Sequence, residues 1–230
     1  MPAWTIAAAQ YPTRNRSVAE HVALHLRFIE AASTLACNLI VFPELSLTGP
    51  GKRHPLPAPP DQELLQPLSF AAARHRMTIV AGLPVEVNGE ARKGVAIFLP
   101  DAPSPLILSQ GQGTCLTPKA NQVSVLPPDA EGHELDPSAT LLAAGTCTRE
   151  FQQQQSVQQL QRLAHKYAIA VLKSNYADGS ALWDENGQLI VRADSGELLL
   201  TGRKYSSGWE GDIIPLHEHR YAIDEIRCDA

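Results

Sequence analysis

The sequence has no run of basic residues and no long apolar segment. Its 230 residues include 19 Lys and Arg against 24 Asp and Glu, which gives a formal net charge of −5. Because a nucleic-acid binder needs clustered Lys and Arg to neutralise phosphates, this composition argues against a nucleic-acid partner. No apolar run approaches the roughly 18 residues that a membrane span requires, so we expect no membrane partner.

The chain has few cysteines, and they are widely separated: Cys37, Cys115, Cys147 and Cys228. No Cys-x-x-Cys pair occurs, so the spacing favours neither a zinc site nor a redox dithiol. The first residues lack the charged segment and apolar core of a signal peptide. We therefore expect reduced thiols and a cytoplasmic protein.

The sequence also lacks a clear site for a metal or a phosphate-bearing cofactor. His21 and His25 are four residues apart on a predicted helix, a spacing that metal sites use, but no HExxH motif surrounds them. We expect both to lie on a solvated or partly buried helix face. The sequence GQG at 111–113 is too short for a phosphate-binding loop, so no cofactor is expected.

Alternating helical and strand patterns fill most of the chain. Hydrophobic residues make up 44% of it, enough for a substantial core. Ser17 and Glu20 have the spacing of a helix capping box, and Asn-Gly at 88–89 is a strong hairpin turn. Predicted helices lie at 17–36, 63–76 (the helix proper starting near Pro67) and 151–167. Predicted strands lie at 4–11, 38–44, 77–87, 92–100, 104–112, 139–147, 168–175, 179–194 as a hairpin, and 196–203, the last clear strand. These patterns indicate a mixed α/β domain.

One strand ends in a carboxylate. In CNLIVFPELSLTG (37–49), four apolar residues lead directly into Pro43 and Glu44. The Pro-rich segment at 49–62 follows and has no apolar period, which predicts an exposed loop at the rim of a pocket. A carboxylate beside a pocket is a candidate functional residue.

Five segments, in this order, resemble the carbon–nitrogen hydrolases, also called the nitrilase superfamily. They are WTIAAAQY (4–11), NLIVFPELSLTG (38–49), MTIVAGLPVEVNG with KGVAIFLP (77–100), TCLTP (114–118) and SALWDENGQLIVRADSGELLLTGR (180–203). The resemblance implies a four-layer α-β-β-α sandwich, here somewhat truncated, over residues 1–203, with 204–230 as a C-terminal tail. It also implies a homodimer and a small amide or nitrile substrate.

The family's chemistry requires a Cys nucleophile, a Glu general base and a Lys that stabilises the oxyanion. By the resemblance, Glu44 is the base. The segment SQGQGTCLTP (109–118) places Gly113 where the Lys belongs, and glycine has no cationic side chain. Lys119 could supply the charge only if its loop folds back, and Lys93, which precedes a different strand, is a poorer candidate.

Cys147 is the candidate nucleophile, and two alignments of its strand are open. In the first, ATLLAAGTC (139–147) is the nucleophile strand and the following helix–strand unit is missing. In the second, this is the next strand along, the nucleophile segment is deleted, and Cys147 is a small apolar residue at a strand end. The run AHKYAIAVLKSN (164–175) resembles the family's helix and strand leading to an Asn, which favours the second.

Two functions follow from these observations. In one, the protein hydrolyses an amide or nitrile C–N bond through Cys147 and Glu44, with a displaced cation. In the other, it is a catalytically inactive homologue with a binding or regulatory role, because an oxyanion site without its cation loses orders of magnitude in rate.

Overall fold

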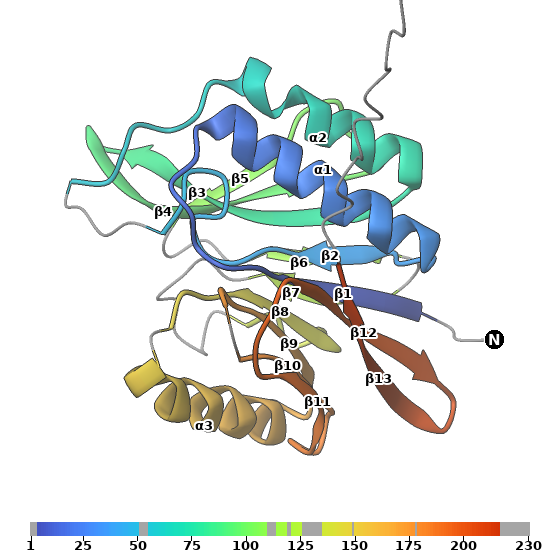
Figure 1. Cartoon of the computed structure of the whole chain (residues 1–230). Coiled ribbons are helices and arrows are strands. Elements are labelled where there is room, and N and C mark those ends of the chain that lie inside the picture. The colour runs from blue at the N-terminus through green and yellow to red at the C-terminus, as the bar shows by residue number, and fades with distance from the viewer. Residues whose placement is uncertain are drawn as a thin grey trace, which may run out of the picture.

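Two stacked β-sheets form the middle of the molecule, and helices cover their outer faces (Figure 1). The computed structural model describes residues 4–50, 55–109, 114–118, 121–125, 135–148, 150–177 and 179–216. Within this part of the chain, α1 (Val18–Thr34) and α2 (Gln62–His75) lie over one sheet, and α3 (Glu150–Tyr167) lies over the other. The prediction of a four-layer α-β-β-α sandwich is confirmed.

The seven-stranded sheet carries most of the N-terminal half. Its strand order is β13-β12-β1-β2-β3-β4-β5. β1 and β2, and β2 and β3, pair in parallel, whereas the other neighbours are antiparallel. The strands are β1 (Trp4–Gln10), β2 (Leu39–Val41), β3 (Thr78–Val87), β4 (Glu90–Phe98), β5 (Leu106–Ser109), β12 (Leu198–Tyr205) and β13 (Gly208–Pro215).

The six-stranded sheet has the order β11-β10-β9-β8-β7-β6. β7, β8 and β9 pair in parallel, and the flanking pairs are antiparallel. The strands are β6 (Thr114–Leu116), β7 (Val123–Val125), β8 (Leu141–Gly145), β9 (Ala170–Ser174), β10 (Ser180–Trp183) and β11 (Leu189–Ala193).

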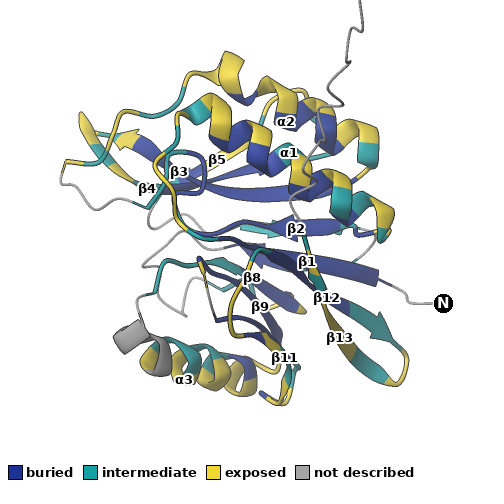
Figure 2. Ribbon diagram, in the orientation of Figure 1, coloured by how far each residue is buried: buried dark blue, intermediate teal, exposed yellow. Residues whose placement is uncertain are grey.

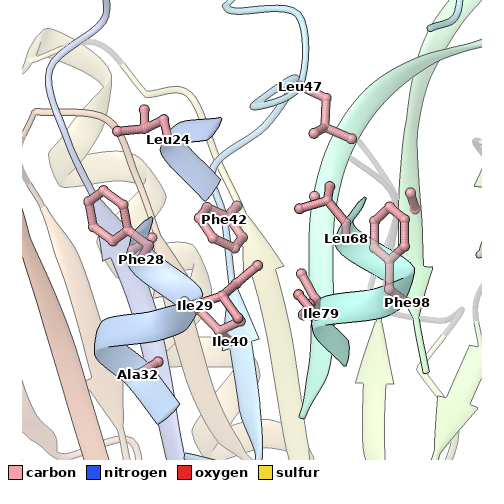
Figure 3. Close-up of a cluster of buried hydrophobic side chains, with 14 of the residues drawn as sticks. Leu24, Phe28, Ile29, Ala32, Ile40, Phe42, Leu47, Leu68, Ile79 and Phe98 are labelled. Carbon is pink, nitrogen blue, oxygen red and sulfur yellow. The ribbon is translucent and has the colours of Figure 1, made fainter. Parts of the chain in front are cut away.

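Three apolar clusters match the spaces between the layers. The first fills the space between the seven-stranded sheet and α1 and α2; Figure 3 shows Phe28 and Ile29 of α1 close to Ile40 and Phe42. The second lies between the two sheets, and the third lies between the six-stranded sheet and α3. Because side chains alternate along a strand, most inner strands contribute to two clusters. Figure 2 accordingly shows buried strands and helices with one exposed face.

Local signals placed several elements correctly. The capping box forms at the start of α1: the Glu20 N–H donates to the Ser17 hydroxyl, and the Ser17 N–H donates to the Glu20 carboxylate. The β3–β4 hairpin turns at Asn88 and Gly89, which both have positive φ, as this turn requires. None of the helices in the described ranges is long and apolar enough to cross a membrane.

Three features differ from the sequence predictions. α2 begins at Gln62 rather than near Pro67, because Pro67 removes a hydrogen bond only to Glu63, whose exposed carbonyl solvent can satisfy. β6 and β7 lie where the sequence predicts no strand, since three residues are too few to show a period. The last predicted strand, 196–203, is followed by a further strand, β13, which pairs with β12, so residues 204–215 extend the sheet. Most side chains of β13 are exposed, so its sequence does not alternate between apolar and polar residues.

Candidate active site

Glu44 lies in a tight turn at the carboxyl end of β2, between the two sheets. Leu45 has φ 52°, a left-handed conformation unusual for a residue with a side chain. The turn is fixed by backbone hydrogen bonds from the Ser46 N–H to the Pro43 carbonyl and from the Leu47 N–H to the Gly82 carbonyl, at 3.2 and 3.0 Å. The carboxylate is therefore presented by a constrained backbone.

Two glycines enclose this turn, one from each sheet. A Cβ on Gly82 of β3 would lie 2.2 Å from the Leu45 nitrogen, and one on Gly145 of β8 would lie 2.5 Å from the Phe42 carbonyl oxygen. Real Cβ atoms do not approach backbone this closely. Only glycine fits at both positions, so the two sheets meet the Glu44 turn at backbone contact distance.

Lys93 of β4 forms an ion pair with Glu44. Its Nζ lies 3.1 Å from Glu44 Oε1, and the two side chains are 35% and 13% exposed. The pair forms because β2, β3 and β4 are neighbours in the seven-stranded sheet, and Lys93 lies opposite Pro84 of β3. This charge-assisted contact between partly buried side chains holds the Lys93 ammonium group at the Glu44 carboxylate.

Cys147 follows β8 and lies beside the same turn. The Glu44 N–H donates to the carbonyl of Thr146, the residue before Cys147, at 3.3 Å. The Tyr176 hydroxyl donates to the Glu44 carbonyl at 2.9 Å. Burial first, and then the charges of Tyr11, Cys147 and Glu44, raise the pKa of Tyr176 well above its usual value. The segment that bears Cys147 and the Tyr176 hydroxyl therefore both contact the backbone of Glu44.

A buried histidine supports the Glu44 turn from α1. His25 Nε2 lies 3.0 Å from the Ser46 hydroxyl, and His25 Nδ1 lies 2.7 Å from the His21 carbonyl. Burial lowers the pKa of His25 to about 3, so the ring is neutral at pH 7. Nδ1 then donates to the carbonyl, and Nε2 accepts from Ser46. The same hydroxyl accepts from the Gly82 N–H at 3.2 Å, which joins the turn to β3.

The expectation that His21 and His25 lie on a solvated or partly buried face is wrong. They are 1% and 0% exposed, because their side of α1 faces the core of the first apolar cluster. His25 stacks on Phe42 with ring centroids 3.9 Å apart. Among the residues that the structure describes, no group of three His, Cys, Asp or Glu side chains could hold a metal ion.

Some of the other predicted site residues lie near Glu44, and others lie outside the part of the chain that the structure describes. Glu44 lies beside the segment that bears Cys147, because the Glu44 N–H donates to the Thr146 carbonyl. Lys119, Gly113 and Cys228 lie outside the described residues. The sequence favoured Lys119 over Lys93 as the source of the cation, yet Lys93 is the lysine that forms an ion pair with Glu44. The available signal was its place shortly after the Asn-Gly hairpin, which makes β4 a neighbour of the strand beside Glu44.

A small cavity between the sheets adjoins Glu44. Its volume is about 10 Å³, which is enough for roughly one water molecule. Its lining residues are Phe42, Pro43, Glu44, Val80, Gly82, Val95, Val125, Ala143 and Gly145. The wall is thus apolar apart from the carboxylate and backbone groups.

The sequence and the fold were compared with known proteins. Residues 5–108, which include Glu44 and Lys93, match the carbon-nitrogen hydrolase family model. An amidase from Nesterenkonia sp. has a similar structure, with a TM-score of 0.75 at 16% identity over 88% of this chain and 90% of that one. A mutant of the Nesterenkonia sp. AN1 amidase in complex with butyramide gives 0.74 at 16% identity, covering 88% and 91%. Another mutant, with the acetamide moiety of fluoroacetamide added covalently at the active-site cysteine, gives 0.73 at 16% identity, covering 88% and 90%.

The structural likeness shows that most of this chain has the fold of the nitrilase-superfamily amidases. Residues 5–108 match the carbon-nitrogen hydrolase family, and the described chain as a whole has the fold of the nitrilase-superfamily amidases.

Proposed function

We propose that this protein hydrolyses the C–N bond of a small amide through Cys147 as nucleophile, Glu44 as general base and Lys93 as the cation. The observation that carries the proposal is the Glu44–Lys93 ion pair, which lies against the segment bearing Cys147. A carboxylate, an ammonium group and a thiol thus occur together although Gly113 stands at the usual lysine position. The similar Nesterenkonia amidase, with its active-site cysteine, supports an amide as substrate.

The reaction would proceed in two halves. Glu44 takes the thiol proton of Cys147, and the thiolate attacks the amide carbon to form a tetrahedral intermediate. Lys93 Nζ donates to the oxyanion, and collapse breaks the C–N bond while Glu44 returns the proton to the leaving amine. Glu44 then deprotonates a water molecule that hydrolyses the thioester, which releases the acid and restores the thiol.

A test of the nucleophile uses ammonia release from short aliphatic amides such as butyramide. We expect Cys147→Ala to reduce the rate by about a thousandfold or more, because the covalent step is lost. The matched control is Cys115→Ala, which removes another half-buried thiol and leaves the rate unchanged. Activity that survives in Cys147→Ala would exclude the proposed nucleophile.

The cation has its own test. We expect Lys93→Met to lower kcat by about a hundredfold, because removing one oxyanion donor costs that order of magnitude. Arg92→Met is the control, since Arg92 is the adjacent residue and pairs with the exposed Glu90 at 3.2 Å instead. Equal effects of the two substitutions on kcat would show that Lys93 does not stabilise the oxyanion.

Two observations favour a second candidate function, that of a non-catalytic homologue. Within the described residues, the cavity that Glu44 lines has room for roughly one water molecule, less than an amide substrate needs. In addition, β7 precedes β8 in the chain and pairs with it in parallel, which agrees with the alignment in which ATLLAAGTC is the next strand along and Cys147 is not the nucleophile. The absence of ammonia release from the parent protein, with equal alkylation rates at Cys147 and Cys115, would favour this function.

A further inference from the structure

Asn175, at the end of β9, contacts both residues that flank Cys147. Its Oδ1 accepts from the Thr146 hydroxyl at 3.1 Å and from the Thr148 N–H at 3.0 Å. Its Nδ2 donates to the Thr148 carbonyl at 3.4 Å. One fully buried amide side chain therefore binds the segment on each side of the thiol.

Two residues of β9 that precede Asn175 also form hydrogen bonds with Thr146 and Thr148. The Thr146 N–H donates to the Ser174 carbonyl at 2.8 Å, and the single hydroxyl proton of Thr146 is shared between that carbonyl, at 3.1 Å, and Asn175 Oδ1. The Lys173 ammonium group, itself fully buried, donates to the Thr148 hydroxyl at 3.2 Å. Thr146 and Thr148 thus have side-chain as well as backbone contacts with one strand end, which restricts where Cys147 can lie.

Asn175 is in turn fixed by residues from two other strands. Its N–H donates to the Ser180 hydroxyl at 3.0 Å, and the Ser180 N–H donates to Gln10 Oε1 at 3.0 Å. Gln10 Nε2 donates to the Ala177 carbonyl at 3.2 Å. Gln10 and Ser180 are both fully buried, so this chain of hydrogen bonds is shielded from water and stronger for it.

We propose that Asn175 is a positioning residue that holds Cys147 in register with Glu44, with Ser180 and Gln10 holding Asn175. The inference rests on the proposed function, since it assumes that Glu44 activates the Cys147 thiol. It accounts for three polar residues at strand ends that the chemistry itself does not use. Correct placement matters because proton transfer requires the thiol and carboxylate within hydrogen-bond reach.

A double-mutant cycle tests this coupling by the rate of Cys147 alkylation with iodoacetamide at neutral pH, read by mass spectrometry. In the parent protein we expect Glu44→Gln to slow alkylation about tenfold, because the base is lost. In an Asn175→Ala background we expect Glu44→Gln to have less than a twofold effect, because the thiol no longer faces the carboxylate. A merely structural role of Asn175 would change the rates without changing this ratio.

The control is Asn38→Ala, which removes another side-chain amide whose Oδ1 accepts from the Thr5 N–H at 3.3 Å, away from Cys147. The tenfold effect of Glu44→Gln should persist in that background. Should Asn175→Ala not fold, Thr146→Val removes one arm of the contact and is expected to weaken the coupling. A tenfold effect in every background overturns the positioning role alone, whereas no effect of Glu44→Gln in the parent overturns the proposed function.

Discussion

Gly82→Ala is expected to lower the free energy of unfolding by about 3 kcal/mol, because the new methyl group meets backbone atoms that cannot move independently. Its Cβ would lie 2.2 Å from the Leu45 nitrogen and 2.9 Å from the Pro43 carbonyl oxygen. Relief requires the Glu44 turn to shift away from β3. The loss is measured by urea unfolding, and the shift by slower alkylation of Cys147 in the folded variant.

The control for this substitution is Gly89→Ala in the β3–β4 turn. A Cβ there meets nothing within 4 Å, and the cost is limited to the positive φ of 81°, about 1 kcal/mol. If both variants lost the same stability, the close approach of Gly82 to the Glu44 turn would not matter energetically. Gly145→Ala should resemble Gly82→Ala, since its Cβ would meet the same turn from the other sheet.

Acidification is expected to destabilise the protein through His25. The pKa of His25 is about 3 in the folded protein because burial disfavours the charged ring, against about 6.5 in an unfolded chain. Below pH 6.5 the unfolded chain binds a proton that folded His25 does not, so stability falls as the pH decreases from about 6.5 toward 3. The expected slope from this residue is at most about 1.4 kcal/mol per pH unit.

Among the groups around His25, the His21 carbonyl raises the pKa of His25 by accepting from Nδ1, but it offsets the lowering by burial only in part. Phe42 stacks on the ring, Tyr11 approaches its edge, and Ser46 bonds to Nε2. His21, on the same helix, has its pKa lowered to about 4, chiefly by burial, and adds to the loss in the same direction.

Urea unfolding from pH 7 to pH 4.5 measures the contribution of His25. We expect His25→Gln to be less stable than the parent at pH 7, since it loses the Ser46 contact, but to have a flatter pH dependence. The free energy of unfolding of the variant still decreases with pH, because His21 is still present. The control is His165→Gln, on the exposed face of α3, which should leave the curve unchanged. An unchanged slope in His25→Gln would contradict the assignment.

Part of the candidate site could be predicted from sequence because its signals are local. The apolar run ending in Pro43 and Glu44 placed a carboxylate at a strand end. ATLLAAGTC did the same for Cys147, and parallel strands β1–β3 and β7–β9 put such ends at one edge of each sheet. The stacking of the two sheets then brings the Glu44 turn beside the segment that bears Cys147.

Other parts of the site depend on contacts between distant segments and were missed. Lys93 reaches Glu44 only because β3 lies between β2 and β4 at the right register. Asn175 was noted as the end of a strand, but its role depends on the adjacent position of β8. The sequence of β13 shows no alternation of apolar and polar residues, because most side chains of this edge strand are exposed.

The sequence by itself determined the helices, the two Asn-Gly hairpins and most of the strands, since hydrophobic period, caps and Asn-Gly turns act over a few residues. Motifs in a fixed order also gave the resemblance to the carbon–nitrogen hydrolases, which the family match over residues 5–108 supports. Only the tertiary structure decided which cation faces Glu44, which glycines must remain glycines and which buried amide holds Cys147. These depend on strand register and sheet stacking, which place residues far apart in the chain within a few ångströms of each other.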